Sequence, residues 1–82
     1  MIIKYFAWLK NITKIEQEII NDSLVIDINT LKKYLSKKYP KLEEYLKDES
    51  LIRFAINMIY TYQNEKITSN DEIALFPPVS GG

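Results

Sequence analysis

The sequence predicts a small α+β domain in which one main helix covers one face of a β-sheet. Short runs of alternating apolar residues lie on both sides of one helical stretch, in a chain of 82 residues. Hydrophobic residues make up 46% of the chain and charged residues 27%, which suits one modest core. The expected order is β-β-α-β-β with a short extra helical turn. A single helix leaves the other face of the sheet solvated or used by a partner.

Two strands are predicted near the N-terminus. Residues 2–9, IIKYFAWL, mix β-branched and aromatic residues in alternation. Residues 15–20 alternate in a similar way, and residues 21–23 then supply turn chemistry. A short connection between the two runs predicts a β-hairpin.

The main helix is predicted to begin after Asp27 and to end near Tyr39. The Asp27 carboxylate can accept hydrogen bonds from the unpaired amides of the first helical turn. Pro40 removes an amide and disfavours helical geometry in the residue before it. Residues 41–47 predict a second, short helical turn. The apolar face of the main helix comprises Ile28, Leu31, Leu35 and Tyr39.

The C-terminal half predicts further strands. Residues 52–59 alternate as one strand with a well-buried face, and residues 60–62 predict the start of another short one. Residues 69–71 form a turn before a last strand over residues 72–76, which the prolines at 77 and 78 end.

Composition excludes several classes of function. Eleven basic and eleven acidic side chains leave no net charge, so the basic field of a nucleic-acid-binding protein is missing. Without cysteine or histidine there are no disulfides, no thiol chemistry and few ways to bind zinc, and no metal site is expected. No apolar run approaches the roughly 20 residues of a membrane helix, and the start lacks signal-peptide order. We expect a cytoplasmic protein.

The stretch FPPVSGG, residues 76–82, holds both glycines of the sequence. Pro77 and Pro78 stiffen the chain, so residues 77–82 should project as an extended tail from a domain of residues 1–76. The six steps from Phe76 to Gly82 can reach roughly 20 Å. Because glycine has no Cβ, such an end can pass a narrow channel into a partner's active site.

The Gly82 carboxylate is the group on which we expect chemistry. A carboxylate is a poor acyl donor at neutral pH, and conversion to an acyl-adenylate with ATP is a common biological remedy. Attack by sulfur then produces a thiocarboxylate, whereas attack by a lysine amine produces an isopeptide bond. A binding module with an inert tail is the third alternative, and the residues of the tail leave all three open.

Four stretches resemble one known family. They are NDEIALFPPVSGG at residues 70–82, FAINMIY at 54–60, YFAWLK at 5–10 and TLKKYLSKKYP at 30–40. Essentially end to end, the chain resembles the small, sulfur-carrier subunits of molybdopterin synthase, ubiquitin-like β-grasp proteins of the MoaD type. The resemblance implies a mixed sheet of four to five strands with the main helix packed on one face.

The resemblance also implies a cycle of sulfur transfer. An E1-like adenylyltransferase of the MoeB type would adenylate Gly82 with Mg-ATP, and a sulfur donor protein would convert that end to a thiocarboxylate. The charged carrier would insert its tail into the large subunit of a heterotetrameric synthase, where sulfur passes to cyclic pyranopterin monophosphate to build the molybdopterin dithiolene. The inserted tail would comprise Pro77, Pro78, Val79, Ser80 and Gly81.

In this cycle the chain binds no cofactor permanently and carries AMP and sulfur only transiently. The acid-base residues belong to the large subunit, so the chain would count as an enzyme only as the small subunit of a sulfurtransferase complex. Related sulfur carriers for thiamine or tRNA thiolation and ubiquitin-like modifiers are the alternatives, although the PPVSGG ending favours the pterin branch. Neither nucleic acid nor membrane is an expected partner.

By position, Phe6, Tyr60 and Phe76 match an apolar patch with which the family binds the large subunit and the activating enzyme. Tyr60 stands where an aliphatic residue is common. Lys10 stands where the family often has arginine; it can pair with a partner carboxylate, but not in the same bidentate way. A further set of lysines on and after the main helix is interpreted as a solvated surface, with an acidic partner as the alternative. This set is Lys32, Lys33, Lys37, Lys38 and Lys41.

Overall fold

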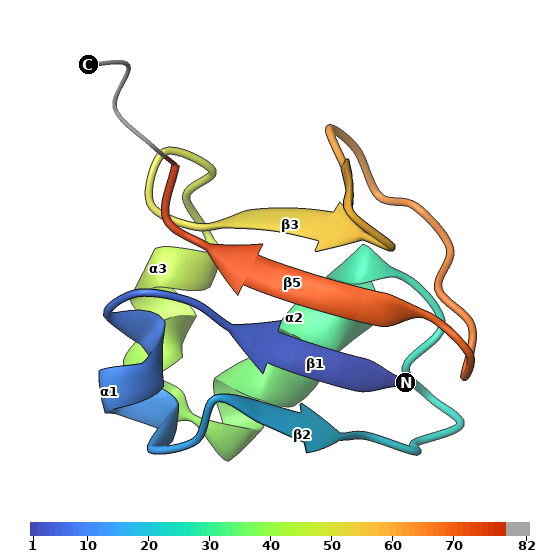
Figure 1. The fold of residues 1–82 in the computed structure, drawn as a ribbon, viewed down its shortest axis with the longest axis horizontal. Coiled ribbons are helices and arrows are strands. Elements are labelled where there is room, and N and C mark those ends of the chain that lie inside the picture. The colour runs from blue at the N-terminus through green and yellow to red at the C-terminus, as the bar shows by residue number, and fades with distance from the viewer. Residues whose placement is uncertain (79–82) are drawn as a thin grey trace.

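A five-stranded mixed sheet with the strand order β2-β1-β5-β3-β4 forms one layer of the molecule (Figure 1). The computed structural model describes residues 1–78. The central strands β1 and β5 run parallel, and every other neighbouring pair is antiparallel. The strands are β1 (Ile2–Tyr5), β2 (Gln17–Ile19), β3 (Arg53–Ile56), β4 (Ile59–Tyr60) and β5 (Glu72–Phe76).

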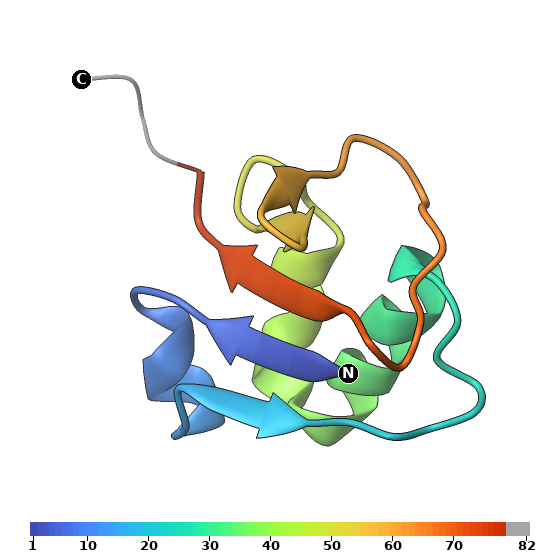
Figure 2. The same ribbon diagram turned by 45° about the vertical axis from the view of Figure 1, so that its right-hand side comes forward.

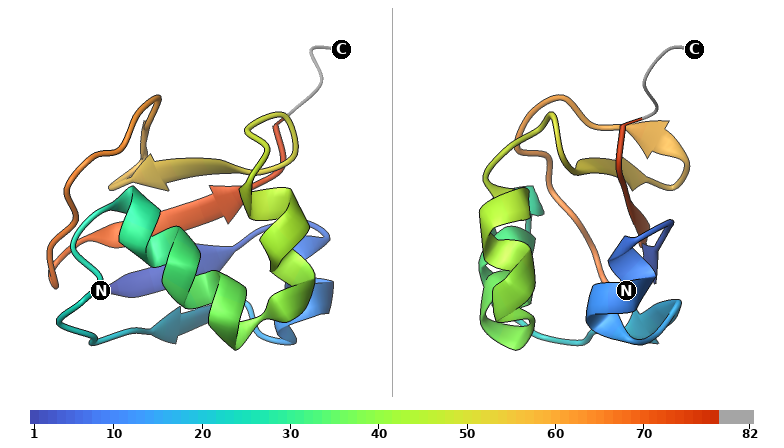
Figure 3. Two further views of the ribbon diagram at one scale, coloured as in Figure 1. Left: turned by 180° about the vertical axis from the view of Figure 1, so that it is seen from behind. Right: turned by 90° about the vertical axis from the view of Figure 1, so that its left-hand side faces the viewer.

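Helices form a second layer on one face of this sheet. Figure 2 and the right-hand view of Figure 3 show α2 and α3 on the same side, with the other face left open. The core fills the space between the two layers; its fully buried members include Ile3, Leu31, Leu35, Ile73 and Leu75. The helical segments are α1 (Leu9–Thr13), α2 (Ile28–Lys38), η1 (Pro40–Leu42) and α3 (Glu43–Leu46). No helix within the described residues is long and apolar enough to cross a membrane.

The main helix α2 confirms the prediction at both ends. The Asp27 side chain accepts a hydrogen bond from the Thr30 amide at 2.8 Å, and Thr30 Oγ1 accepts one from the Asp27 amide at 3.0 Å. This reciprocal capping satisfies two donors that would otherwise be unpaired at the start of the helix. α2 stops at Lys38, and Pro40 opens η1. The second helical turn follows as η1 and α3.

The prediction of a strand over residues 2–9 is wrong beyond Tyr5. Ala7 adopts a left-handed conformation with φ of 56°, which breaks the extended chain. The short helix α1 then buries Leu9 completely. β1 and β2 do pair antiparallel as predicted, but the connection between them contains α1, and β2 is shorter than the predicted residues 15–20.

The prediction of one strand over residues 52–59 is also wrong. Asn57 and Met58 have φ values of 49° and 70°, and left-handed residues at both positions suit the tight turn of a two-residue β-hairpin. β3 therefore ends at Ile56 and folds back as β4, with Ile56 opposite Ile59. The last strand β5 has the predicted bounds, Glu72–Phe76.

Candidate partner-binding site

The open face of the sheet carries a row of small side chains at its centre. Because neighbouring residues of a strand point to opposite faces, Ile73 and Leu75 of β5 face the helices whereas Ala74 faces away. The strand register places Ala74 beside Lys4 on one side and Ala55 on the other, and Ala55 beside Tyr60. The two alanines therefore leave a shallow floor between larger neighbours.

Aromatic side chains surround this floor. Tyr60 and Phe76 pack with their ring centroids 5.2 Å apart. The Phe6 amide donates a hydrogen bond to the Leu75 carbonyl oxygen at 3.0 Å, which holds Phe6 beside the end of β5. Phe6 is 46% exposed and Tyr60 57% exposed. We call the resulting hollow the apolar depression; it is lined by Phe6, Ala7, Ala55, Met58, Tyr60, Ala74, Phe76 and Pro77.

The structure thus brings together three predicted partner residues, Phe6, Tyr60 and Phe76, from three separate strands or strand ends. It adds Met58, which is 87% exposed at the hairpin turn, and Ala7. The sequence analysis missed both because it placed them inside continuous strands. An asparagine at position 57, within an otherwise apolar run, was the available signal for a turn at Met58.

Lys10 lies on α1 and is exposed. It lines a neighbouring hollow that also includes Phe6 and Lys4, so Phe6 connects Lys10 with the apolar depression. Lys4 is held by an ion pair with Glu72 at 3.1 Å, whereas Lys10 forms no ion pair among residues 1–78. A role for Lys10 toward a partner carboxylate stays a prediction.

The predicted tail starts at the edge of the apolar depression. Pro77 lines the depression, and neither Pro77 nor Pro78 belongs to a helix or strand. The remaining predicted tail residues, Val79, Ser80 and Gly81, and the reacting Gly82 lie outside the described residues. Among residues 1–78, no group of three or more acidic side chains gathers in a way that could hold a metal ion.

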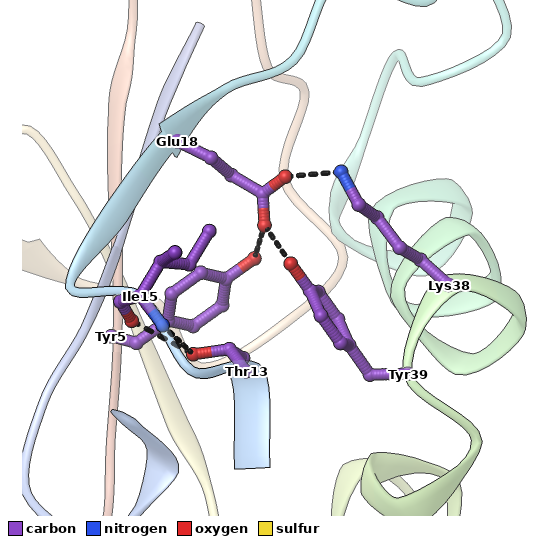
Figure 4. Close-up of polar contacts among 6 residues, drawn as sticks. All are labelled: Tyr5, Thr13, Ile15, Glu18, Lys38 and Tyr39. Carbon is purple, nitrogen blue, oxygen red and sulfur yellow. Dashed lines mark hydrogen bonds and ion pairs between the residues drawn. The ribbon is translucent and has the colours of Figure 1, made fainter. Parts of the chain in front are cut away.

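A polar cluster on the opposite, helix-covered face joins β2 to the end of α2 (Figure 4). We call it the Glu18 junction. The Glu18 carboxylate accepts hydrogen bonds from the Tyr5 hydroxyl at 2.6 Å, from the Tyr39 hydroxyl at 2.5 Å and from the Lys38 ammonium. The Glu18 side chain is only 10% exposed. All three hydrogen bonds to the carboxylate come from its own chain. Because Glu18 lies in the sheet and Lys38 in α2, the junction connects the two layers.

The pKa values in the Glu18 junction follow from these contacts. Burial alone would raise the pKa of Glu18, but the hydrogen bonds from Lys38, Tyr39 and Tyr5 outweigh burial and lower it below its usual value. Burial and the hydrogen bond to Glu18 raise the pKa of Tyr39 to about 12 and raise the pKa of Tyr5 as well. The hydrogen bond to Glu18 raises the pKa of Lys38. At neutral pH the junction contains one carboxylate, one ammonium and two neutral phenols.

The two clusters differ in what they can do chemically. The lining of the apolar depression contains no Asp, Glu, Lys or Arg side chain, so it offers contact area and no charged group. An exposed apolar area of this kind is a candidate binding surface for another protein. In the Glu18 junction the carboxylate is hydrogen-bonded by Tyr5, Tyr39 and Lys38 of its own chain, so the junction connects the two layers.

The sequence is similar to known proteins. The model of the ThiS family matches residues 3–82. A molybdopterin synthase sulfur carrier subunit from Dictyostelium discoideum is 39% identical over 77 residues, covering 84% of this chain and 87% of that protein. The sequence is thus similar to a sulfur carrier along most of its length.

Solved structures are also similar along nearly the whole chain. A putative molybdopterin converting factor subunit 1 from Pyrococcus furiosus matches with a TM-score of 0.82 at 26% identity, covering 95% of each chain. Small archaeal modifier protein 1 from Methanosarcina acetivorans matches at 0.76 and 25% identity, over 99% of this chain and 94% of that one. A chain in the complex of subunits 1 and 2 of the molybdopterin-converting factor from Helicobacter pylori matches with a TM-score of 0.67 at 27% identity. The match covers 99% of this chain and 96% of that one. The fold is the ubiquitin-like β-grasp that the resemblance implied.

Proposed function

Because the chain belongs to the ThiS family, we propose that it is the sulfur-carrier subunit of a molybdopterin synthase. The observation that carries the proposal is the 39% identity to the Dictyostelium discoideum sulfur carrier subunit. The structural likeness to a molybdopterin converting factor subunit 1 supports it. On this proposal the chain is the small subunit of a sulfurtransferase complex.

The reacting group in this proposal is the Gly82 carboxylate. Its oxygen attacks the α-phosphorus of Mg-ATP on an E1-like adenylyltransferase, pyrophosphate leaves, and an acyl-adenylate forms. The terminal sulfur of a persulfide on a donor protein then displaces AMP and forms an acyl disulfide. A second thiol of the donor or of the activating enzyme attacks the donor sulfur of that disulfide, so that a new disulfide forms and the thiocarboxylate is released. In the synthase this sulfur passes to cyclic pyranopterin monophosphate, and the carrier's acyl group returns to a carboxylate with an oxygen from water. The absence of cysteine from the chain fits a carrier that holds sulfur on its backbone terminus.

The apolar depression has a role in this cycle as the docking surface for the large synthase subunit and, in turn, for the activating enzyme. Phe6, Tyr60 and Phe76 supply exposed aromatic area without charged neighbours in the lining, which suits an interface core. Pro77 stands at the edge of this surface. A partner bound there is therefore well placed to receive the residues that follow. The Helicobacter pylori complex of subunits 1 and 2 supports a large subunit as the partner.

A ubiquitin-like modifier is the second candidate function. The likeness to the small archaeal modifier protein from Methanosarcina acetivorans favours it. The two candidates share the acyl-adenylate and differ in the acceptor: a modifier transfers the Gly82 acyl group to a lysine amine and becomes an isopeptide-linked conjugate. A blot of cell extract for such conjugates separates the two.

The first experiment is intact-mass spectrometry of the purified protein after incubation with a candidate activating enzyme, Mg-ATP and a sulfur donor. We expect the mass gain of one oxygen-to-sulfur exchange. The matched control is a variant that lacks Gly81 and Gly82, which should fold normally and gain no mass. An unchanged mass of the full chain, with an activating enzyme shown to work on another carrier, would contradict the proposal, as would a gain that persists without the two glycines.

A further inference from the structure

The helix α2 concentrates positive charge. α2 contains four lysines and no acidic residue, although the whole chain has no net charge. α2 and α3 lie side by side in the left-hand view of Figure 3. A groove between them, which we call the lysine groove, is lined by Lys32, Lys33, Ser36, Lys37, Glu43, Leu46 and Lys47.

Most of the charge in the lysine groove is unpaired. Among residues 1–78, Lys32, Lys33 and Lys37 form no ion pair. Lys47 lies 3.8 Å from Glu43, but both side chains are more than half exposed, and such a pair is weak. The groove therefore attracts carboxylates from outside the chain.

A second hollow adjoins the lysine groove and shares Lys32 with it. Its lining includes Phe54, whose ring centroid is 5.6 Å from the Lys32 ammonium, and Arg53, which lies 5.5 Å from the Tyr62 ring centroid. The Lys32 ammonium thus sits between an apolar wall and the groove. We call the two hollows together the basic track; five basic side chains and two acidic ones, Glu43 and Glu49, line it.

We propose that the lysine groove docks an acidic segment of a partner polypeptide. Lys33 and Lys37 are one turn apart on α2, a rise of about 6 Å. Carboxylates at every second position of an extended peptide repeat at about 6.6 Å, so both ammonium groups can be paired at once. Lysine presents a compact charge on a flexible stem, which suits carboxylates at such approximate spacings.

The surroundings of the groove favour a polypeptide over a nucleic acid. Glu43 in the lining of the groove and Glu49 in the adjoining hollow interrupt the basic track and would repel a continuous phosphate backbone. No aromatic side chain lines the lysine groove, and the Phe54 and Tyr62 rings of the adjoining hollow lie against Lys32 and Arg53, so neither is a free platform on which bases stack. A peptide with separated carboxylates can place them beside the lysines and away from the two glutamates.

This docking surface is separate from the one in the proposed function. The lysine groove lies on the helical layer and the apolar depression on the opposite face of the sheet, as the right-hand view of Figure 3 shows for the two layers. A partner in the groove therefore leaves the open face free for another. The proposal concerns binding alone and stands or falls independently of sulfur transfer.

The test is a titration of the full-length, isotope-labelled protein with a short peptide that alternates Glu and Ser, followed by amide chemical shifts. We expect shifts in α2, α3 and the start of β3, and weaker binding at higher salt. The double variant Lys33→Glu/Lys37→Glu should lose at least about tenfold in affinity. The matched control, Lys14→Glu/Lys66→Glu, makes the same change of net charge at two exposed lysines outside the groove and should change the affinity less than about threefold.

Several outcomes would overturn the proposal. They are no saturable peptide binding, equal loss in both double variants, and shifts centred on the apolar depression. Tighter binding of a thymidine oligonucleotide than of the peptide would assign the groove to nucleic acid instead. Because two added glutamates could destabilise α2, the neutral double variant Lys33→Gln/Lys37→Gln is measured as well. Circular dichroism verifies that each variant is folded.

Discussion

The two faces of the sheet differ in which kind of side chain is covered and which kind is exposed to solvent. On the helix-covered face, the Glu18 carboxylate is 10% exposed and is hydrogen-bonded by Tyr5, Tyr39 and Lys38 of its own chain. On the open face, Phe6 is 46% exposed and Tyr60 57% exposed. A charged side chain is largely covered on one face and aromatic side chains are exposed on the other, against the usual preference of each.

This difference separates stability from binding. A buried charge is tolerated when every hydrogen bond is satisfied, and the loss of one partner is costly. An exposed aromatic ring contributes little to folding but much to an interface that covers it. Substitutions on the helix-covered face should therefore lower the free energy of unfolding, and substitutions in the apolar depression should lower affinity for a partner.

The largest effect is expected from Glu18→Ala. The variant leaves the buried Tyr5 hydroxyl without its acceptor and the Lys38 ammonium without its ion-pair partner. We expect the free energy of unfolding in urea to fall by about 3 kcal/mol. Glu16→Ala is the control, because the Glu16 side chain is exposed and only its backbone oxygen accepts a bond, from the Tyr5 amide at 2.8 Å. Equal stability of the two variants would show that the junction does not hold the layers together.

The next effect is expected from Tyr60→Ala, measured by calorimetric titration with the large subunit of a molybdopterin synthase. Tyr60 lines the apolar depression, whereas Tyr62 is similarly exposed and lies outside it. We expect Tyr60→Ala to lose about 2 kcal/mol of binding free energy, roughly thirtyfold. Tyr62→Ala should change affinity less than about threefold. A larger loss of affinity from Tyr62→Ala than from Tyr60→Ala would show that the interface does not lie on the open face.

The smallest effect is the pH dependence of stability. Since hydrogen bonds lower the pKa of Glu18 below 4.5 in the folded state, the unfolded chain binds the proton more tightly. The stability that Glu18 contributes is therefore complete above that pH and is lost as pH falls through the folded pKa.

Glu18→Gln isolates this contribution because it cannot titrate. We expect the difference in unfolding free energy between wild type and Glu18→Gln to shrink as the pH is lowered from about 6 to about 3. The comparison is needed because hydrogen bonds from Thr30, Ser50 and Thr68 also lower the pKa values of three exposed or half-exposed aspartates. They are Asp27, Asp48 and Asp71. A constant difference over this range would mean that Glu18 does not titrate with folding.

Elements with purely local signals could be predicted from the sequence. The capping of α2 at Asp27 and its stop before Pro40 depend on neighbouring residues, and so do the turn before β5 and the prolines after it. The predicted strands over residues 2–9 and 52–59 are too long. Alternation in the sequence continues across Ala7 and Asn57, whereas the backbone turns at both residues. A left-handed alanine carries no composition signal.

The candidate site was predictable only through the family resemblance. Phe6, Tyr60 and Phe76 are far apart along the chain, and periodicity alone does not group them. The register of β1, β5, β3 and β4 brings them around two alanines, and their contact with a partner stays a prediction. The Glu18 junction had no signal at all, since its partners are 13, 20 and 21 residues away.

Residue order alone therefore determined the helix, the last strand, the α+β class and the expectation that chemistry belongs to the tail, because each depends on contacts or covalent properties within a few residues. The tertiary structure decided which strands are neighbours, which face stays open, and that a glutamate side chain on an edge strand is largely covered beside α2. Those features depend on side chains brought together across many residues. Their free energy comes from the packing of the two layers, which no local stretch contains.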